Sequence, residues 1–80
     1  MLTVRFFAGL KELIKQSDLR IECLGGMTVG KLRNKLNMLY PRIAALLAQS
    51  RCAVNDQICD DGKELFDGAE VAFLPPVSGG

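Results

Sequence analysis

The sequence predicts one α+β domain, in which a single long helix packs on one face of a mixed sheet. Eighty residues are enough for one domain and too few for two. Hydrophobic residues make up 49% of the chain and charged residues 24%, which is typical of a folded globular protein. The spacing of apolar residues also changes along the chain, from every second position to every third or fourth and back again.

Two strands are expected at the start of the chain. The first is predicted by apolar residues at alternate positions, which are Leu2, Val4, Phe6 and Ala8. We expect a loop over residues 9–17, with one helical turn at 11–13. The second strand is predicted by the alternating residues Leu19, Ile21 and Cys23. It ends before Gly25-Gly26, a pair typical of a chain break.

The main helix begins after Thr28, a favourable N-cap residue. Its buried face is predicted by apolar residues spaced three and four apart, which are Val29, Leu32, Leu36 and Leu39. Pro41 ends the helix near Tyr40, because the residue before a proline avoids the helical conformation.

The second half contains shorter elements. The apolar segment at residues 43–47 is expected to be helical or irregular. Strands are expected over 51–55 and 70–74, and Val71 and Phe73 take the inward positions of the last one. Ile58-Cys59 is an isolated apolar pair between two turn signals. This order of elements gives the α+β class.

Composition excludes several classes of function. The chain has a net charge of +1, which argues against a protein that binds nucleic acid or anionic lipid. It contains no histidine, so it lacks the commonest general base and the usual zinc ligand. A self-contained enzyme and a metal site are therefore not expected.

The cysteines Cys23, Cys52 and Cys59 lack Cys-x-x-Cys spacing, and an odd number in so short a chain predicts neither a disulfide framework nor a zinc site. Free thiols fit a reducing cytosol. The first residues lack the features of a signal peptide. No apolar stretch approaches the ~18–20 residues that span a membrane. We expect a soluble, cytoplasmic protein.

The end of the chain is the segment Pro75-Pro76-Val77-Ser78-Gly79-Gly80, which we expect to be a flexible tail on a domain of residues 1–74. Two prolines end the sheet and stiffen the exit. Gly79 and Gly80 have no Cβ, so the tip fits a channel too narrow for other residues. A carboxylate at Gly80 would react after adenylation, and a sulfur nucleophile would then leave a thiocarboxylate. The alternative is a frayed end or linker stub, but Gly-Gly after a rigid Pro-Pro favours a function.

Three segments resemble the small sulfur-carrying subunits of molybdopterin synthase, which are ubiquitin-like proteins of the β-grasp fold. They are Phe6-Phe7-Ala8 with Glu12-Leu13, Ala53-Val54-Asn55, and the run from Asp67 to Gly80. The ending is the most specific of the three. Ala69 stands where the family commonly has an acidic residue, and Leu74 where it often has an aromatic one. The change at Leu74 bears on the partner interface.

The resemblance implies a role in molybdenum cofactor biosynthesis. An adenylating enzyme would activate Gly80 with ATP, and a sulfurtransferase system would supply the sulfur. The thiocarboxylate would then enter the large synthase subunit and donate sulfur to cyclic pyranopterin monophosphate. It also implies an assembly of two small and two large subunits. The chain itself would bind no cofactor and would be a non-catalytic donor.

The alternation of inward and outward side chains along the strands predicts a docking surface. Phe7 and Leu74 are out of phase with the inward residues of their strands, so in a β-grasp sheet Phe7, Ala72 and Leu74 share the outer face. Ile58 is expected to join them. An exposed apolar patch on a small protein usually marks a binding site. The predicted partner-binding residues are Phe7, Ile58, Leu74, Pro75, Pro76, Val77 and Ser78.

Other groups of residues have weaker signals. Cys52 and Cys59 are either a redox or sulfur-relay pair or, as we prefer, buried structural thiols. Basic residues at 31, 33 and 35 are a phosphate patch or, preferably, a solvated helix face. Acidic residues between 56 and 70 lack the spacing of a calcium loop, so turn and surface roles are preferred. Residues 1–51 contain nine basic and three acidic side chains (+6), and residues 52–80 contain one and six (−5).

Three functions remain open at this point. The preferred one is the sulfur carrier of molybdopterin synthase. A second is the sulfur carrier of thiamine synthesis, which has the same fold and Gly-Gly ending but against which the Pro-Pro-Val-Ser spacer argues. A third is a ubiquitin-like protein modifier or an interaction domain without chemistry.

Overall fold

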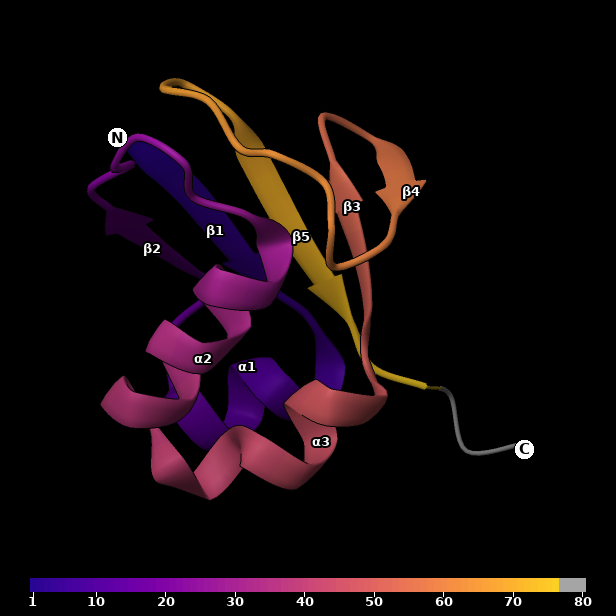
Figure 1. Cartoon of the computed structure of the whole chain (residues 1–80). Helices are drawn as coiled ribbons and strands as arrows, with labels where there is room; N and C mark the ends of the chain where they lie inside the picture. The colour runs from indigo at the N-terminus through magenta and orange to yellow at the C-terminus, as the bar shows by residue number, and fades with distance from the viewer. Residues whose placement is uncertain (77–80) are drawn as a thin grey trace.

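The computed structural model describes residues 1–76, and within them five strands form one sheet with the helices on one side of it (Figure 1). The strands are β1 (Leu2–Phe6), β2 (Asp18–Ile21), β3 (Arg51–Val54), β4 (Gln57–Cys59) and β5 (Glu70–Leu74). The helices are α1 (Ala8–Ile14), α2 (Val29–Leu39) and α3 (Ala44–Gln49), with a 3₁₀ turn η1 (Pro41–Ile43) before α3. The predicted α+β class and mixed sheet are confirmed.

The strands lie in the order β2-β1-β5-β3-β4, so the first and last strands of the chain are central neighbours. β1 and β5 run parallel, with Val4 opposite Val71 and Phe6 opposite Phe73. The other three pairs of strands are antiparallel. Because β1 and β5 are parallel, their C-terminal ends lie at the same end of the sheet.

The core lies between the inner face of the sheet and the helices. β1 and β5 bury alternate residues, and those of β5 are Val71 and Phe73, as predicted from their spacing. α2 covers them with Val29, Leu32 and Leu36, all fully buried. Leu39, also expected on this face, is 52% exposed, so burial ends with Leu36 although the helix continues to Leu39.

The ends of α2 follow the sequence signals. The Thr28 hydroxyl accepts a hydrogen bond from the Lys31 backbone N–H at 3.3 Å, which satisfies one of the unpaired donors of the first turn. At the other end the Tyr40 N–H donates to the Leu36 carbonyl at 2.8 Å, and Pro41 then begins η1. No helix within residues 1–76 is long and apolar enough to cross a membrane.

The expectation for residues 8–17 was wrong in two respects. Ala8 does not continue the first strand but begins α1 and is exposed. The expected single turn is a seven-residue helix that buries Leu10. The residues of α1 include Ala, Leu, Lys and Glu, which favour helix. This preference outweighs the apolar alternation that predicted a strand as far as Ala8. The second strand is also shorter than expected, because β2 ends at Ile21, before the half-buried Cys23.

The isolated pair Ile58-Cys59 belongs to a strand, β4, that pairs with β3. A two-residue turn joins the strands, and its residues Asn55 and Asp56 have φ angles of 48° and 70°. Positive φ at both positions is typical of the type I′ turn that matches the twist of a hairpin. The turn signal read from the sequence therefore marks the hairpin.

Candidate functional site

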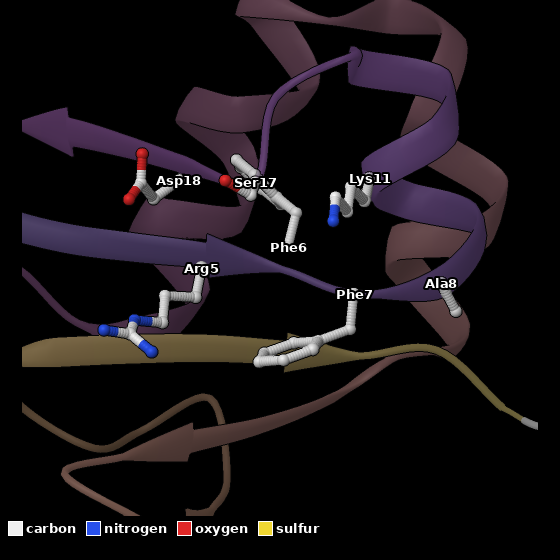
Figure 2. A pocket seen from close by; sticks show the side chains of 7 residues that line it. All are labelled: Arg5, Phe6, Phe7, Ala8, Lys11, Ser17 and Asp18. Atoms are coloured by element: carbon white, nitrogen blue, oxygen red, sulfur yellow. The ribbon is translucent and has the colours of Figure 1, made fainter.

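The outer face of the sheet, away from the helices, has a row of apolar side chains that crosses three strands. The strand register aligns Ala72 of β5 with Ala53 of β3, and Ala53 with Ile58 of β4. Leu74 lies two residues beyond Ala72 on the same face. Phe7 follows β1 at the same end of the sheet, and Figure 2 shows its ring extending toward β5. We call Phe7, Ala53, Ile58, Ala72 and Leu74 the outer-face patch.

The residues of the outer-face patch differ in exposure. Phe7 is 42% exposed and Ile58 is 59% exposed, although both are large and apolar. Ala72 and Leu74 are half-buried, and Ala53 is buried, so small side chains form the floor between Ile58 and Phe7. The structure thus brings the four residues expected on this face together. Their role in binding a partner stays a prediction.

Charged residues border the outer-face patch. Arg5 of β1 lies opposite Ala72, and its Nε is 3.2 Å from a carboxylate oxygen of Glu70. Arg51 lies opposite Leu74. Both partners of the Arg5–Glu70 pair are about half exposed, and such pairs contribute little to stability. An apolar centre with a polar rim is the usual composition of a protein–protein interface.

An open hollow of about 380 Å³ lies beside Phe7, at the C-terminal end of β1 (Figure 2). Its lining residues come from β1, α1 and the start of β2, and they are Arg5, Phe6, Phe7, Ala8, Lys11, Ser17 and Asp18. Sequence reasoning did not identify Lys11, Ser17 or Asp18. No local pattern indicates them, because the hollow forms only where three separate segments meet.

The tail begins next to this end of the outer-face patch. β5 ends at Leu74, opposite Arg51, and is followed by the half-buried Pro75 and the exposed Pro76. Proline has no backbone N–H, so it cannot extend the strand pairing in the usual way. The remaining predicted site residues, Val77, Ser78, Gly79 and Gly80, lie outside the described residues.

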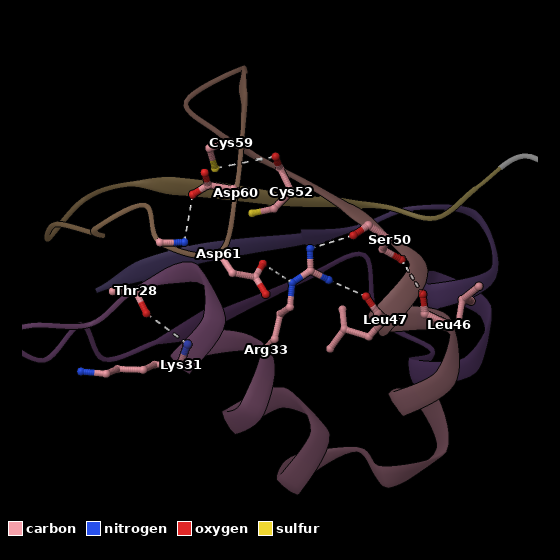
Figure 3. A network of polar contacts seen from close by, with 11 residues as sticks. Thr28, Lys31, Arg33, Leu46, Leu47, Ser50, Cys52, Cys59, Asp60 and Asp61 are labelled. Atoms are coloured by element: carbon pink, nitrogen blue, oxygen red, sulfur yellow. Dashed lines mark hydrogen bonds and ion pairs between the residues drawn. The ribbon is translucent and has the colours of Figure 1, made fainter.

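Arg33 is not on a solvated helix face, so that expectation was wrong for this residue. Its side chain is only 15% exposed, and the guanidinium carbon lies over the ring of Phe73, 5.2 Å from the ring centroid. The guanidinium donates to Asp61 at 2.8 Å, to the Ser50 carbonyl at 2.7 Å and to the Leu47 carbonyl (Figure 3). The Leu47 carbonyl also accepts a hydrogen bond from the Ser50 N–H at 3.1 Å, so Arg33 adds a charged donor to the C-terminal end of α3.

The neighbouring lysines do not complete a phosphate patch with Arg33. Lys31 and Lys35 are exposed, and the Lys31 ammonium donates to the Gly26 carbonyl at 3.0 Å. Acidic residues of the second half have the surface roles preferred from the sequence, since Asp61 pairs with Arg33 and Glu70 with Arg5. Residues 1–76 contain no cluster of three or more His, Cys, Asp or Glu side chains placed to hold a metal ion.

Two of the three thiols are neighbours. Cys52 of β3 is 1% exposed, and burial raises the pKa of its thiol to about 12, assisted by Cys59. Cys59 of β4 is half-buried, and its Sγ donates to the Cys52 carbonyl at 3.7 Å. Cys23 is half-buried, and all three are free thiols. The preference for buried thiols is confirmed for Cys52 and only in part for Cys59.

Comparison with known proteins identifies the family. The ThiS family matches residues 4–80 of the chain. The chain belongs to the ThiS family. A molybdopterin synthase sulfur carrier subunit from Escherichia coli is 37% identical, and the alignment covers 100% of both chains. One from Mycobacterium tuberculosis is 35% identical over 96% of this chain and 94% of its own.

Solved structures agree with the ThiS assignment. A putative molybdopterin converting factor subunit 1 from Pyrococcus furiosus is 25% identical, with a TM-score of 0.86 over 95% of this chain and 97% of that one. Subunit 1 in a complex with subunit 2 of molybdopterin-converting factor from Helicobacter pylori is 29% identical, with a TM-score of 0.70 over 99% and 97%. The archaeal modifier SAMP1 from Haloferax volcanii has a TM-score of 0.87 at 25% identity over 99% and 98%. The ubiquitin-like β-grasp fold and the resemblance stated from the sequence are both confirmed.

Proposed function

We propose that this ThiS-family chain is the sulfur-carrier subunit of a molybdopterin synthase. One observation supports this most directly: the segment that leads to Gly79-Gly80 leaves the sheet beside an exposed apolar patch with a charged rim. Relatives that align over nearly the whole chain are named as sulfur carrier subunits, and a similar chain is solved in complex with a second subunit. A carrier needs both features, a surface that docks and an end that reacts.

In the proposed reaction the Gly80 carboxylate is the reacting group. Its oxygen attacks the α-phosphate of ATP in an adenylating partner, which forms a glycyl adenylate and releases pyrophosphate. A sulfur nucleophile supplied by a sulfurtransferase system then displaces AMP, and the product is a thiocarboxylate on Gly80. In the large subunit this sulfur passes to cyclic pyranopterin monophosphate. The sequence contains no histidine, so proton transfers are assigned to the partners.

The domain would position the tail. The outer-face patch would dock on the large subunit and on the adenylating enzyme in turn, while Pro75 and Pro76 start the tail in an extended direction. Val77 and Ser78 would then span the partner's channel. Gly79 offers no side chain to its walls. We propose two small and two large subunits in the synthase, a cytoplasmic location, and ATP as a substrate of the activating partner only.

A second function, protein modification, is favoured by one specific likeness. SAMP1 from Haloferax volcanii, whose fold matches over 99% of this chain, is named as a small archaeal modifier protein. In that case the Gly80 carboxyl would form an isopeptide with a lysine. Mass spectrometry of the protein from its native host separates the two functions, because a carrier replaces one oxygen of Gly80 by sulfur and a modifier is joined to another chain. A sulfur gain is also expected of a thiamine-pathway carrier, which fails to support molybdopterin formation.

Deletion of Gly80 tests the proposed chemistry. Removing one residue withdraws the carboxylate by ~3.3 Å, and a misplacement of even about 1 Å can cost a hundredfold in rate. We expect the deletion to abolish ATP-dependent adenylation and molybdopterin formation. Gly79→Ala keeps the length but adds a methyl group, so it should reduce transfer less completely.

The melting temperature serves as the control for this test. The strand β5 ends at Leu74, six positions before the deleted residue, so both variants should melt at the wild-type temperature. A deletion variant that is adenylated and supports molybdopterin formation at the wild-type rate would refute the carrier mechanism.

A further inference from the structure

The inner face of the β3–β4 hairpin has two cysteines directly opposite each other. Cys52 of β3 is the register partner of Cys59 of β4. Directly opposed residues of antiparallel strands have Cα atoms about 4.5–5.5 Å apart. A disulfide spans Cα separations of about 4.4–6.8 Å. The two sulfurs can therefore join without any change of strand register.

The two thiols also differ in accessibility. Cys52 is 1% exposed and packs in the core, opposite Phe73 of β5. Cys59 lies on the edge strand and is half-buried, and its Sγ points back toward the Cys52 carbonyl (Figure 3). A reagent from solvent would therefore meet Cys59 first, with Cys52 directly behind it.

We propose that Cys52 and Cys59 are a dithiol site that closes to a reversible intramolecular disulfide by exchange with a low-molecular-weight disulfide such as oxidised glutathione. The inference does not depend on the proposed carrier function. In the first step the Cys59 thiolate attacks one sulfur of glutathione disulfide. The reagent's S–S bond breaks, a mixed disulfide forms at Cys59, and one glutathione thiolate leaves.

In the second step the Cys52 sulfur attacks the Cys59 sulfur and expels the second glutathione as a thiolate, which takes up the Cys52 proton. In total the protein loses two protons and two electrons, and one glutathione disulfide becomes two glutathione thiols. Burial raises the pKa of Cys52 to about 12, so this thiol is protonated at neutral pH and reacts poorly with free reagent. Its place opposite Cys59 supplies the effective concentration for an intramolecular step.

Cys23 is the internal control that the fold provides. It follows β2, and β2 and β4 are the two opposite edges of the sheet. Four strand spacings of about 4.8 Å each separate these edges by roughly 19 Å. Cys23 is thus too far from Cys59 to form a disulfide with it in the folded domain. Any glutathione bound at Cys23 should remain as a mixed disulfide.

The test treats the reduced full-length protein with oxidised glutathione under native conditions, traps remaining thiols by alkylation, and maps peptides by mass spectrometry. In wild type and in Cys23→Ser we expect a Cys52–Cys59 link, seen as the loss of two hydrogen atoms, and its reversal by dithiothreitol. Cys52→Ala should instead retain glutathione at Cys59. In Cys59→Ser no link should form, and Cys52 should be alkylated only after denaturation.

Three results would overturn the proposal. They are a persistent glutathione adduct at Cys59 of the wild type, a wild-type protein that stays fully reduced, and a link that includes Cys23. Circular dichroism of each variant before oxidation confirms the native fold. Should Cys52→Ala be unfolded, wild type and Cys23→Ser still decide the matter, because the predicted link needs no variant at position 52.

Discussion

Arg33 makes contacts that its position in the helical pattern of α2 does not predict. Helical spacing put it next to Leu32, at the border of the buried face of α2, and its charge indicated solvent. In the structure its guanidinium lies over the ring of Phe73 and reaches carbonyls 14 and 17 residues away in sequence. A charged group that is mostly buried needs paired hydrogen-bond partners, because an unpaired charge away from water is costly. Helix periodicity could not predict this, because the acceptors belong to the end of another helix.

Replacing Arg33 by Met should destabilise the domain by about 2–3 kcal/mol, because a hydrogen bond to a charged group contributes about 1.5–3 kcal/mol and the change removes the charged donor from the carbonyls of Leu47 and Ser50. Methionine keeps an unbranched apolar side chain at this position, so the change removes the guanidinium together with its hydrogen bonds and its contact with the Phe73 ring. Urea unfolding followed by circular dichroism gives the free energy of unfolding. Lys35→Met, on the exposed side of the same helix, is the matched control and should stay within about 0.5 kcal/mol of wild type. Equal stability of the two variants would mean that the Arg33 contacts contribute nothing.

At the scale of elements, length decides which ones the sequence could predict. α2 and β5 were predicted closely, because 11 and five residues with a clear period fix both the type of element and its buried face. α1 and β4, with seven and three residues, were not, since so few positions do not distinguish a helix or a strand from a loop. β4 is a strand because its pairing with β3 stabilises it, and the turn at Asn55 sets that pairing.

The β3–β4 turn can be tested at Asn55. Its φ of 48° is costly for most residues, and its side-chain oxygen accepts a hydrogen bond from the Glu70 N–H at 2.9 Å. Asn55→Gly keeps the backbone conformation but loses the bond, which should cost about 1 kcal/mol. Asn55→Ala loses both, so we expect a further cost of about 1 kcal/mol from the left-handed conformation. In thermal unfolding we expect the melting temperature to be highest for wild type, lower for Asn55→Gly and lowest for Asn55→Ala. The reverse order of the two variants would show that the left-handed φ is not a constraint.

At the scale of the whole molecule, the fold brings together two halves of the sequence that have opposite net charges. The net charges of +6 and −5 in the two halves would make a strongly polar chain. Each ion pair among the described residues joins one half to the other: Arg5 with Glu70, Arg33 with Asp61, and the Met1 amino group with Asp67. Steering by the remaining charge is therefore weaker than the sequence alone indicates. In the docking proposed above, apolar contact would therefore be the main source of affinity.

The sequence did predict that Phe7 and Leu74 lie on the outer face of the sheet. A strand alternates its side chains strictly, so the phase of Phe7 and Leu74 against the buried residues is enough to assign both side chains to the outer face. It could not predict the floor formed by Ala53 and Ala72, which depends on the register of β3 against β5. Nor could it predict the hollow beside Phe7, which needs α1 in place.

The partner-binding role of the outer-face patch can be tested with Phe7→Arg. The side chain is 42% exposed, so arginine should fit without unfolding the domain. A charge within an apolar interface would be desolvated without a partner, and we expect binding to both the large subunit and the adenylating enzyme to weaken at least about tenfold, or 1.4 kcal/mol. Titration calorimetry measures both affinities. Met38→Arg adds the same charge at an 82% exposed position of α2, on the helical side of the sheet, and should bind normally. If Phe7→Arg keeps wild-type affinity for both partners, the outer-face patch is not the docking surface.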